Sequence, residues 1–137
     1  MSLPALTGEI FVGGQWRAGA GRPFVSIAPA DGLAIWRGAE AAAADVDDAI
    51  LLARSAFAAW RRTSIEDRIA LVRRFAKLVE ANKADMAALI SRETGKPLWD
   101  AATEAAAMIG KAELAVKGYA ERTPTKDAPA GAFTARI

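Results

Sequence analysis

The spacing of hydrophobic residues changes from alternation to a helical period at Asp45, and this change constrains the fold of the 137-residue chain more than any other feature. After Asp45, apolar residues recur every three or four positions in four successive stretches, as on one face of an α-helix. These stretches comprise Val46, Ile50, Ala53, Phe57 and Trp60; Ile65, Ile69, Val72, Phe75 and Val79; Met86, Leu89 and Ile90; and Ala105, Ile109, Ala112, Val116 and Tyr119. The sequence therefore predicts about four amphipathic helices.

Residues with known preferences for helix ends mark the boundaries of these helices. Thr63-Ser64-Ile65-Glu66 fits a capping box that opens the second helix, and residues 82–85 restart the chain as a third. Gly95 can close the third helix in the left-handed conformation, and Pro97 suits the first turn of the fourth. We therefore expect short connections between the last three helices.

The residues before Asp45 carry β-type patterns. Gly13-Gly14, between Ile10-Phe11-Val12 and Trp16, is typical of a two-residue hairpin turn, because glycine tolerates the positive φ that such turns need. The other predicted segments are strands at residues 24–27, 33–36 and 133–137 and loops at residues 29–32 and 123–131. The fold expected from these patterns is a β-hairpin and short strands followed by helices.

Alanine dominates the apolar composition. The chain has 34 alanines, whereas Leu, Ile, Val and Phe together number only 30. Alanine favours helix formation but buries little surface. We therefore expect helices that form readily around a thin core, unless another segment packs on them.

Composition also limits the classes of partner and compartment. A net charge of +2 is too small to favour nucleic acid as a partner. The absence of cysteine excludes disulfides and thiolate metal sites. No apolar stretch approaches the length of a membrane span, and the first residues lack the pattern of a signal peptide, so we expect a soluble cytoplasmic protein.

Few side chains are suited to catalysis. The sequence has neither cysteine nor histidine, so a Ser-His or Cys-His nucleophile–base pair cannot form. A site built from lysine or carboxylates stays open in principle. The only acidic clusters are Asp45/Asp47/Asp48 and Glu66/Asp67, which we interpret as helix-start charges rather than a catalytic or metal-binding pair. We assign no catalytic, cofactor-binding or metal-ligating residue.

Glycine-rich and basic segments also have simpler interpretations. Gly19-Ala20-Gly21 lacks the third glycine of a dinucleotide-binding loop, and Pro97 stands where a phosphate loop would need Ser or Thr after Lys96. We interpret Lys96 as a cation near a helix C-terminus. In the basic cluster between Arg61 and Lys77, the residues that lie mainly opposite the apolar stripe, as on a solvated helix, are Arg68, Arg73, Arg74 and Lys77. The four tryptophans are interpreted as packing anchors.

Four motifs, taken in order, resemble the N-terminal segment of the aldehyde dehydrogenase superfamily. They are Phe-Val-Gly-Gly-Gln-Trp at 11–16, Ser-Ile-Ala-Pro-Ala-Asp-Gly at 26–32, Asp-Val-Asp at 45–47 with the run at 53–60, and Glu-Thr-Gly-Lys-Pro at 93–97. The resemblance covers essentially residues 9–137. Within the superfamily, residues 96–104 and 107–111 look most like the succinylglutamate-semialdehyde dehydrogenases of arginine catabolism.

The resemblance implies an α/β fold in which residues 1–137 are the N-terminal part of the NAD-binding domain, stopping near the start of the oligomerisation hairpin. It implies an enzyme that oxidises an aldehyde to a carboxylate through a cysteine thioester, uses NAD or NADP, and forms a homo-oligomer. The family's catalytic cysteine and glutamate and its cofactor-binding residues fall beyond position 137. We therefore expect this chain to be inactive by itself and to bind neither cofactor well.

The resemblance carries over no metal site. Some members hold a monovalent cation with two backbone carbonyls at the position of Ser26-Ile27 and an aspartate where this chain has Ala105, next to Glu104. Three hypotheses of function remain. The leading one is an N-terminal portion of the dehydrogenase whose partner is the remainder of that chain. The others are a freestanding helical interaction module without catalysis and a small nucleic-acid binder.

Overall fold

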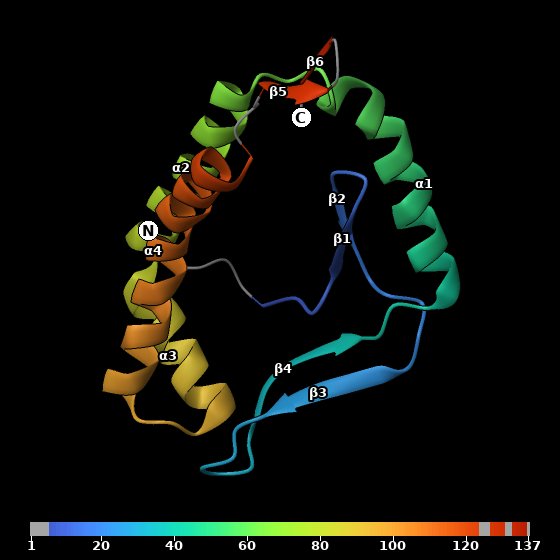
Figure 1. Cartoon of the computed structure of the whole chain (residues 1–137). Coiled ribbons are helices and arrows are strands. Elements are labelled where there is room, and N and C mark those ends of the chain that lie inside the picture. The colour runs from blue at the N-terminus through green and yellow to red at the C-terminus, as the bar shows by residue number, and fades with distance from the viewer. Residues whose placement is uncertain (1–5, 124–126, 131–132, 137) are drawn as a thin grey trace.

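The computed structural model describes residues 6–123, 127–130 and 133–136. Its elements in chain order are β1 (Ile10–Val12), β2 (Gln15–Arg17), β3 (Pro23–Ile27), β4 (Ala34–Ala39), α1 (Ala43–Trp60), α2 (Ile65–Ala81), α3 (Lys83–Thr94), α4 (Leu98–Arg122), β5 (Asp127–Ala130) and β6 (Phe133–Arg136). The predicted order of short strands followed by four helices is confirmed (Figure 1).

The first hairpin has the turn that the sequence predicts. β1 and β2 pair antiparallel, with Val12 opposite Gln15. The two residues between them, Gly13 and Gly14, have φ values of 61° and 85°. Both angles lie in the left-handed region that this kind of tight turn requires. The turn lies next to α1, because a Cβ built on Gly13 would be 2.7 Å from Cδ1 of Leu52.

The second hairpin carries an irregularity near its turn. β3 and β4 pair antiparallel with Ser26 opposite Trp36, and the register then shifts so that Ile27 pairs with Ala34. The shift leaves one extra residue on β4, as in a β-bulge. The strand predicted at residues 33–36 is present but lies further along the chain, at residues 34–39.

The end of the chain contains a third hairpin rather than a loop followed by one strand. Residues 127–130 form β5, which pairs antiparallel with β6. The loop predicted at 123–131 is therefore wrong for these four residues, and the strand predicted from residue 133 is confirmed as far as Arg136. β5 contains Pro129, which a strand at a sheet edge can accept. Residues 124–126, 131–132 and 137 lie outside the described residues.

Helices α2, α3 and α4 pack on one another, whereas α1 lies apart from them and packs on β1 (Figure 1). The core between α3 and α4 consists of alanines: Ala87, Ala101 and Ala105 are buried. Met86 and Ile90 flank this cluster. Alanine side chains let the two helices approach closely but bury little apolar area, as the composition predicts.

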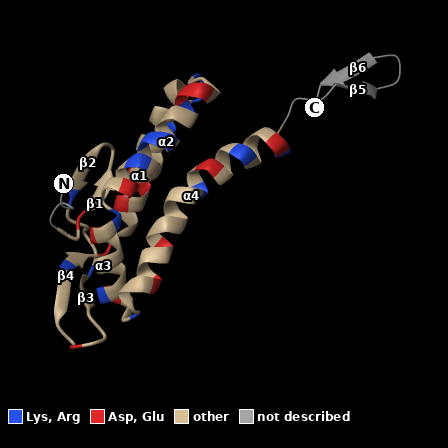
Figure 2. Cartoon of the chain, turned by 90° about the vertical axis from the view of Figure 1, so that its left-hand side faces the viewer, with Lys and Arg blue, Asp and Glu red and all other residues tan. Residues whose placement is uncertain are grey.

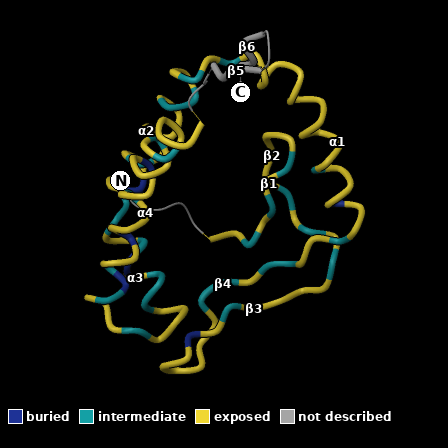
Figure 3. The backbone as a smooth tube through the Cα atoms, in the orientation of Figure 1, coloured by how far each residue is buried: buried dark blue, intermediate teal, exposed yellow. Residues whose placement is uncertain are grey.

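Most large apolar side chains among the described residues are exposed. The stripe of α1 forms as predicted, yet Val46, Ile50, Phe57 and Trp60 are between 46% and 59% exposed. Figure 3 accordingly shows α1 almost entirely in the colour of exposed residues. Trp16 and Trp99 are 65% and 73% exposed, so their interpretation as packing anchors is wrong. Among the described residues, no helix is long and apolar enough to cross a membrane.

The helix ends differ from the predicted ones in detail. The cap of α2 is Ser64, whose hydroxyl accepts the backbone N–H of Asp67 at 3.1 Å, rather than the predicted box that begins at Thr63. Gly95 closes α3 in the left-handed conformation, as predicted. Pro97 precedes the first turn of α4 rather than occupying it. The starts of α2 and α4 thus each differ from the predicted position by one residue.

Candidate functional site

The motif at residues 93–97 forms the connection between α3 and α4, and this connection lies beside the turn of the β3–β4 hairpin (Figure 1). Gly95 has φ of 75°, and a Cβ built there would lie 2.8 Å from Cγ of Pro29. The hydroxyl of Ser91 donates to the carbonyl oxygen of Lys96 at 2.7 Å. The positive φ of Gly95 and the close approach of Pro29 both favour glycine at this position of the motif.

Glu93 joins this connection to the hairpin. Its carboxylate oxygen Oε1 accepts the hydroxyl of Ser26 at 2.7 Å and also accepts the indole N–H of Trp36. The ring of Trp36 meets the ring of Phe24 edge to face, with centroids 5.0 Å apart. Sequence patterns did not indicate this contact, because no local spacing relates Glu93 to residues so far away along the chain.

Lys96 lies between two carboxylates of α4. Its ammonium forms an ion pair with Asp100 at 3.2 Å and another with Glu104. These hydrogen bonds, with Glu104 the larger cause, raise the pKa of Lys96 above its usual value. Lys96 follows the C-terminal cap of α3, as the sequence predicts, and its ammonium also binds carboxylates at the start of α4.

Asp45 is the one buried charged residue among those described. Its Oδ2 accepts the backbone N–H groups of Ala20 and Ala42, both at 2.9 Å, and its Oδ1 lies 3.0 Å from the guanidinium of Arg17. The bond from Ala20, then that from Ala42, holds the pKa of Asp45 below its usual value. Asp45 therefore binds the start of α1, as the sequence predicts, and it also binds the preceding loop and the first hairpin. Asp47 and Asp48 are exposed.

Two basic residues of α2, Arg68 and Arg73, have partners inside the molecule. Arg73 forms a bidentate ion pair with Glu113 of α4. Its Nε donates to Oε1 at 2.8 Å and its Nη2 donates to Oε2 at 3.1 Å, and these bonds lower the pKa of Glu113. Arg68 donates to the carbonyl of Trp60 and lies over its ring, 5.2 Å from the centroid. Figure 2 shows acidic and basic residues interspersed along α4. These two arginines therefore make contacts between helices.

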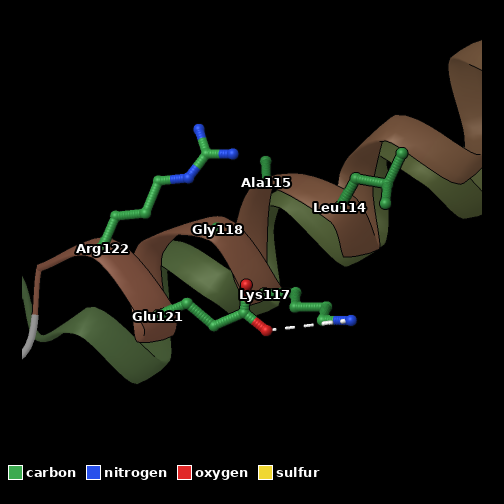
Figure 4. A pocket seen from close by; sticks show the side chains of 6 residues that line it. All are labelled: Leu114, Ala115, Lys117, Gly118, Glu121 and Arg122. Carbon is green, nitrogen blue, oxygen red and sulfur yellow. Dashed lines mark ion pairs between the residues drawn. The ribbon is translucent and has the colours of Figure 1, made fainter.

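A hollow of about 590 Å³ lies along the last turns of α4 (Figure 4). The described residues that line it all come from this helix: Leu114, Ala115, Lys117, Gly118, Glu121 and Arg122. Lys117 and Glu121 form an ion pair at 3.7 Å, and Arg122 points to a different side. Its charged groups do not converge on a common point, so the hollow has no arrangement suited to catalysis.

The position that would supply a cation ligand in some relatives is part of the core. Ala105 is fully buried in the contact between α3 and α4, where it offers a methyl group. Its neighbour Glu104 is engaged by Lys96. Among the described residues, no group of three or more side chains is placed to hold a metal ion.

The described residues do not form a Rossmann-type dinucleotide fold. The three sheets formed by the part of the chain that the structure describes are each two-stranded and antiparallel. A dinucleotide fold needs parallel strands joined through helices, with a glycine-rich turn at the start of a helix. The site at residues 93–97 is instead a set of contacts that holds two helices and a hairpin together.

Comparison with known proteins agrees with this architecture. The model of the aldehyde dehydrogenase family matches residues 16–135. The N-succinylglutamate 5-semialdehyde dehydrogenase of Paraburkholderia xenovorans is 52% identical over 118 residues, covering 86% of this chain and 24% of that protein. The chain therefore belongs to the aldehyde dehydrogenase family. It spans about a quarter of the length of the curated relatives it matches.

Solved structures share the fold. The crystal structure of succinate-semialdehyde dehydrogenase from Burkholderia pseudomallei superposes with a TM-score of 0.81 at 32% identity, covering 91% of this chain and 26% of that one. The NADP-dependent glyceraldehyde-3-phosphate dehydrogenase from Bacillus halodurans, solved with NADP, gives a TM-score of 0.81 at 26% identity, covering 94% and 27%. This segment therefore has the α/β fold of the matching part of these dehydrogenases.

Proposed function

We propose that this chain is the N-terminal part of the NAD(P)-binding domain of a dehydrogenase that oxidises N-succinylglutamate 5-semialdehyde to the carboxylate. The proposal includes the cysteine thioester route, a homo-oligomer, a place in arginine catabolism and a cytoplasmic location for the whole enzyme. The observation that carries it is the 52% identity over 86% of the chain to the Paraburkholderia enzyme. The β5–β6 pair would then begin the oligomerisation hairpin.

The exposed apolar faces support the role of a part within a larger unit. The stripe of α1 is half exposed along its whole length, and Leu114 of α4 is 66% exposed. Contiguous apolar surface of this kind marks a face that another segment covers. In our proposal, that segment is the remainder of the dehydrogenase chain.

The chain by itself is proposed to be inactive. It contains no cysteine, so it cannot form a thioester with an aldehyde. Its antiparallel hairpins do not supply a dinucleotide site, so NAD or NADP would be held by the remainder of the enzyme. In this proposal, the chain contributes the apolar helix faces on which the remainder of the enzyme packs.

A chimera tests the proposal. Residues 16–135 replace the matching stretch of the Paraburkholderia enzyme, and reduction of NAD or NADP is followed with N-succinylglutamate 5-semialdehyde. A control chimera carries the matching stretch of the Burkholderia succinate-semialdehyde dehydrogenase. We expect the first chimera to keep most of the parent activity and the control to keep less, because packing surfaces diverge with sequence.

Two outcomes would contradict the proposal. The first is a folded chimera that is inactive while the control chimera turns over. The second is reduction of the dinucleotide by the isolated chain above the buffer level, persisting through repeated purification. A cooperatively folding, monodisperse isolated chain that does not complement the rest of the enzyme would favour a freestanding interaction module instead.

A further inference from the structure

Glu93 occupies a position that is unfavourable for a carboxylate. It is the second-last residue of α3, near the negative end of the helix dipole, where acidic side chains are destabilising. The side chain is also exposed, so burial does not stabilise it. The two donors from the β3–β4 hairpin offset this unfavourable position.

The two donors form a matched pair. Ser26 and Trp36 lie directly opposite each other in the antiparallel register of β3 and β4, so their side chains lie on the same face of the hairpin. Both donate to the same carboxylate oxygen of Glu93. The β-bulge follows immediately after this pair, and bulges commonly redirect neighbouring side chains. Both strands are therefore held by one acceptor.

We propose that Glu93 is a positioning residue that fixes the β3–β4 hairpin on the end of α3. Hydrogen bonds to an ionised acceptor are short and strong, and an isolated two-stranded hairpin is marginally stable. The contact between Gly95 and Pro29 fixes the hairpin at a second point nearby. Glu93 thus sets the direction in which this hairpin faces.

The direction matters for the outer face of the hairpin. Val25 alternates with Ser26 along β3 and therefore points away from Glu93, and both Val25 and Ile27 are exposed. In the whole enzyme, the remainder of the chain would cover these side chains. This consequence rests on the proposed function, whereas the role of Glu93 within the chain does not.

The experiment uses the indole N–H of Trp36 as the reporter. Nitrogen-15 spectra of the 137-residue chain resolve one indole signal for each tryptophan, and Trp36→Phe identifies the relevant one. The variants are Glu93→Ala, which removes the shared acceptor, and Glu93→Gln, which keeps one amide oxygen as an uncharged acceptor. The matched control is Glu80→Ala, because Glu80 is likewise the second-last residue of its helix, α2.

We expect Glu93→Ala to shift the Trp36 indole signal and to speed amide exchange in β3 and β4 at least about tenfold relative to α3. Glu93→Gln should produce a smaller change, and Glu80→Ala should leave both readouts unaltered. An unchanged indole signal and unchanged exchange in Glu93→Ala would overturn the inference. If Glu93→Ala does not fold, Ser26→Ala removes one donor and should give a partial effect; no effect would overturn the inference equally.

The chimera separates this inference from the proposed function. If the chimera with Glu93 folds but is inactive while the control chimera turns over, the proposed function fails, yet the indole and exchange measurements still decide the role of Glu93. If that chimera is active, Glu93→Ala within it should lower kcat several-fold with Glu93→Gln partly restoring it. Equal activity of the three chimeras would contradict the consequence for the whole enzyme.

Discussion

Arg17, the last residue of β2, forms an ion pair with Asp45 in the first turn of α1 at 3.0 Å. The same carboxylate accepts two backbone N–H groups, one from the loop at Ala20 and one from the start of the helix at Ala42. One buried side chain therefore holds the first hairpin, the following loop and α1 together. These contacts depend on the charge of Asp45, and so they depend on pH.

Stability should fall at acidic pH through Asp45. Its contacts hold its pKa below 3.8, so the stability they contribute is complete above about pH 4 and is lost as pH falls through the lower folded pKa. Glu113, whose pKa is also lowered, contributes in the same direction. We expect the urea midpoint to fall below about pH 4. Asp45→Asn should lower the midpoint at neutral pH and weaken this dependence.

Urea unfolding followed by circular dichroism checks this prediction, with Asp47→Asn as the control because Asp47 is an exposed neighbour in the same helical turn. The control should follow the pH profile of the unaltered chain. Parallel profiles for Asp45→Asn and the unaltered chain would refute a role for Asp45.

Enlarging a side chain in the alanine core should destabilise the chain. Ala105 is fully buried between α3 and α4, so Ala105→Leu must push the helices apart or strain rotamers, at a cost of about 1–3 kcal/mol. Ala106→Leu, at the exposed neighbouring position of α4, should change the free energy of unfolding by less than about 0.5 kcal/mol. Denaturant unfolding of both variants measures the difference, and equal costs would contradict the packing.

Gly95 should not tolerate a side chain. Gly95→Ala places a Cβ on a backbone with φ of 75° and against Pro29, which should cost about 1–2 kcal/mol or more. Gly110, in the middle of α4, has open space around its position, so Gly110→Ala should stabilise the chain by about 0.5–1 kcal/mol. Thermal unfolding of the two variants should shift the midpoint in opposite directions. A shift of the same sign in both would contradict this assignment.

The isolated chain should self-associate through its apolar helix faces. Ile50 and Phe57 lie on the exposed stripe of α1, so replacing both with Glu should shift the chain toward monomer by roughly tenfold or more in dissociation constant. Arg54→Gln with Arg61→Gln changes the net charge by the same amount at exposed positions of the same helix and its end. Sedimentation velocity compares the pairs, and a monomeric unaltered chain would refute the prediction.

The sequence predicts the elements well because their signals are local. The period of the stripes, the two glycines of the first turn and the left-handed Gly95 each depend on neighbouring residues, and the structure confirms them. β5 was missed because its pairing depends on β6, and Pro129 disfavours strand formation when it is considered alone.

The site was less predictable because its contacts join distant segments. Ser26 and Glu93 are 67 positions apart, and Arg73 and Glu113 are 40 apart. Only the fold brings these pairs together. The role of two tryptophans was overestimated for a related reason: Trp16 meets the ring of Phe11 but stays 65% exposed, and Trp99 is 73% exposed among the described residues.

The exposed stripe of α1 also affects how substitutions would be tolerated. In the isolated chain, polar replacements along this stripe should be nearly neutral, while changes at Asp45, Glu93 or Gly95 should be harmful. Once another segment covers the stripe, the same apolar positions become core and lose that tolerance. Mutational scans of the chain alone and of the whole dehydrogenase would therefore differ most at the apolar positions of α1, while Asp45 stays sensitive in both.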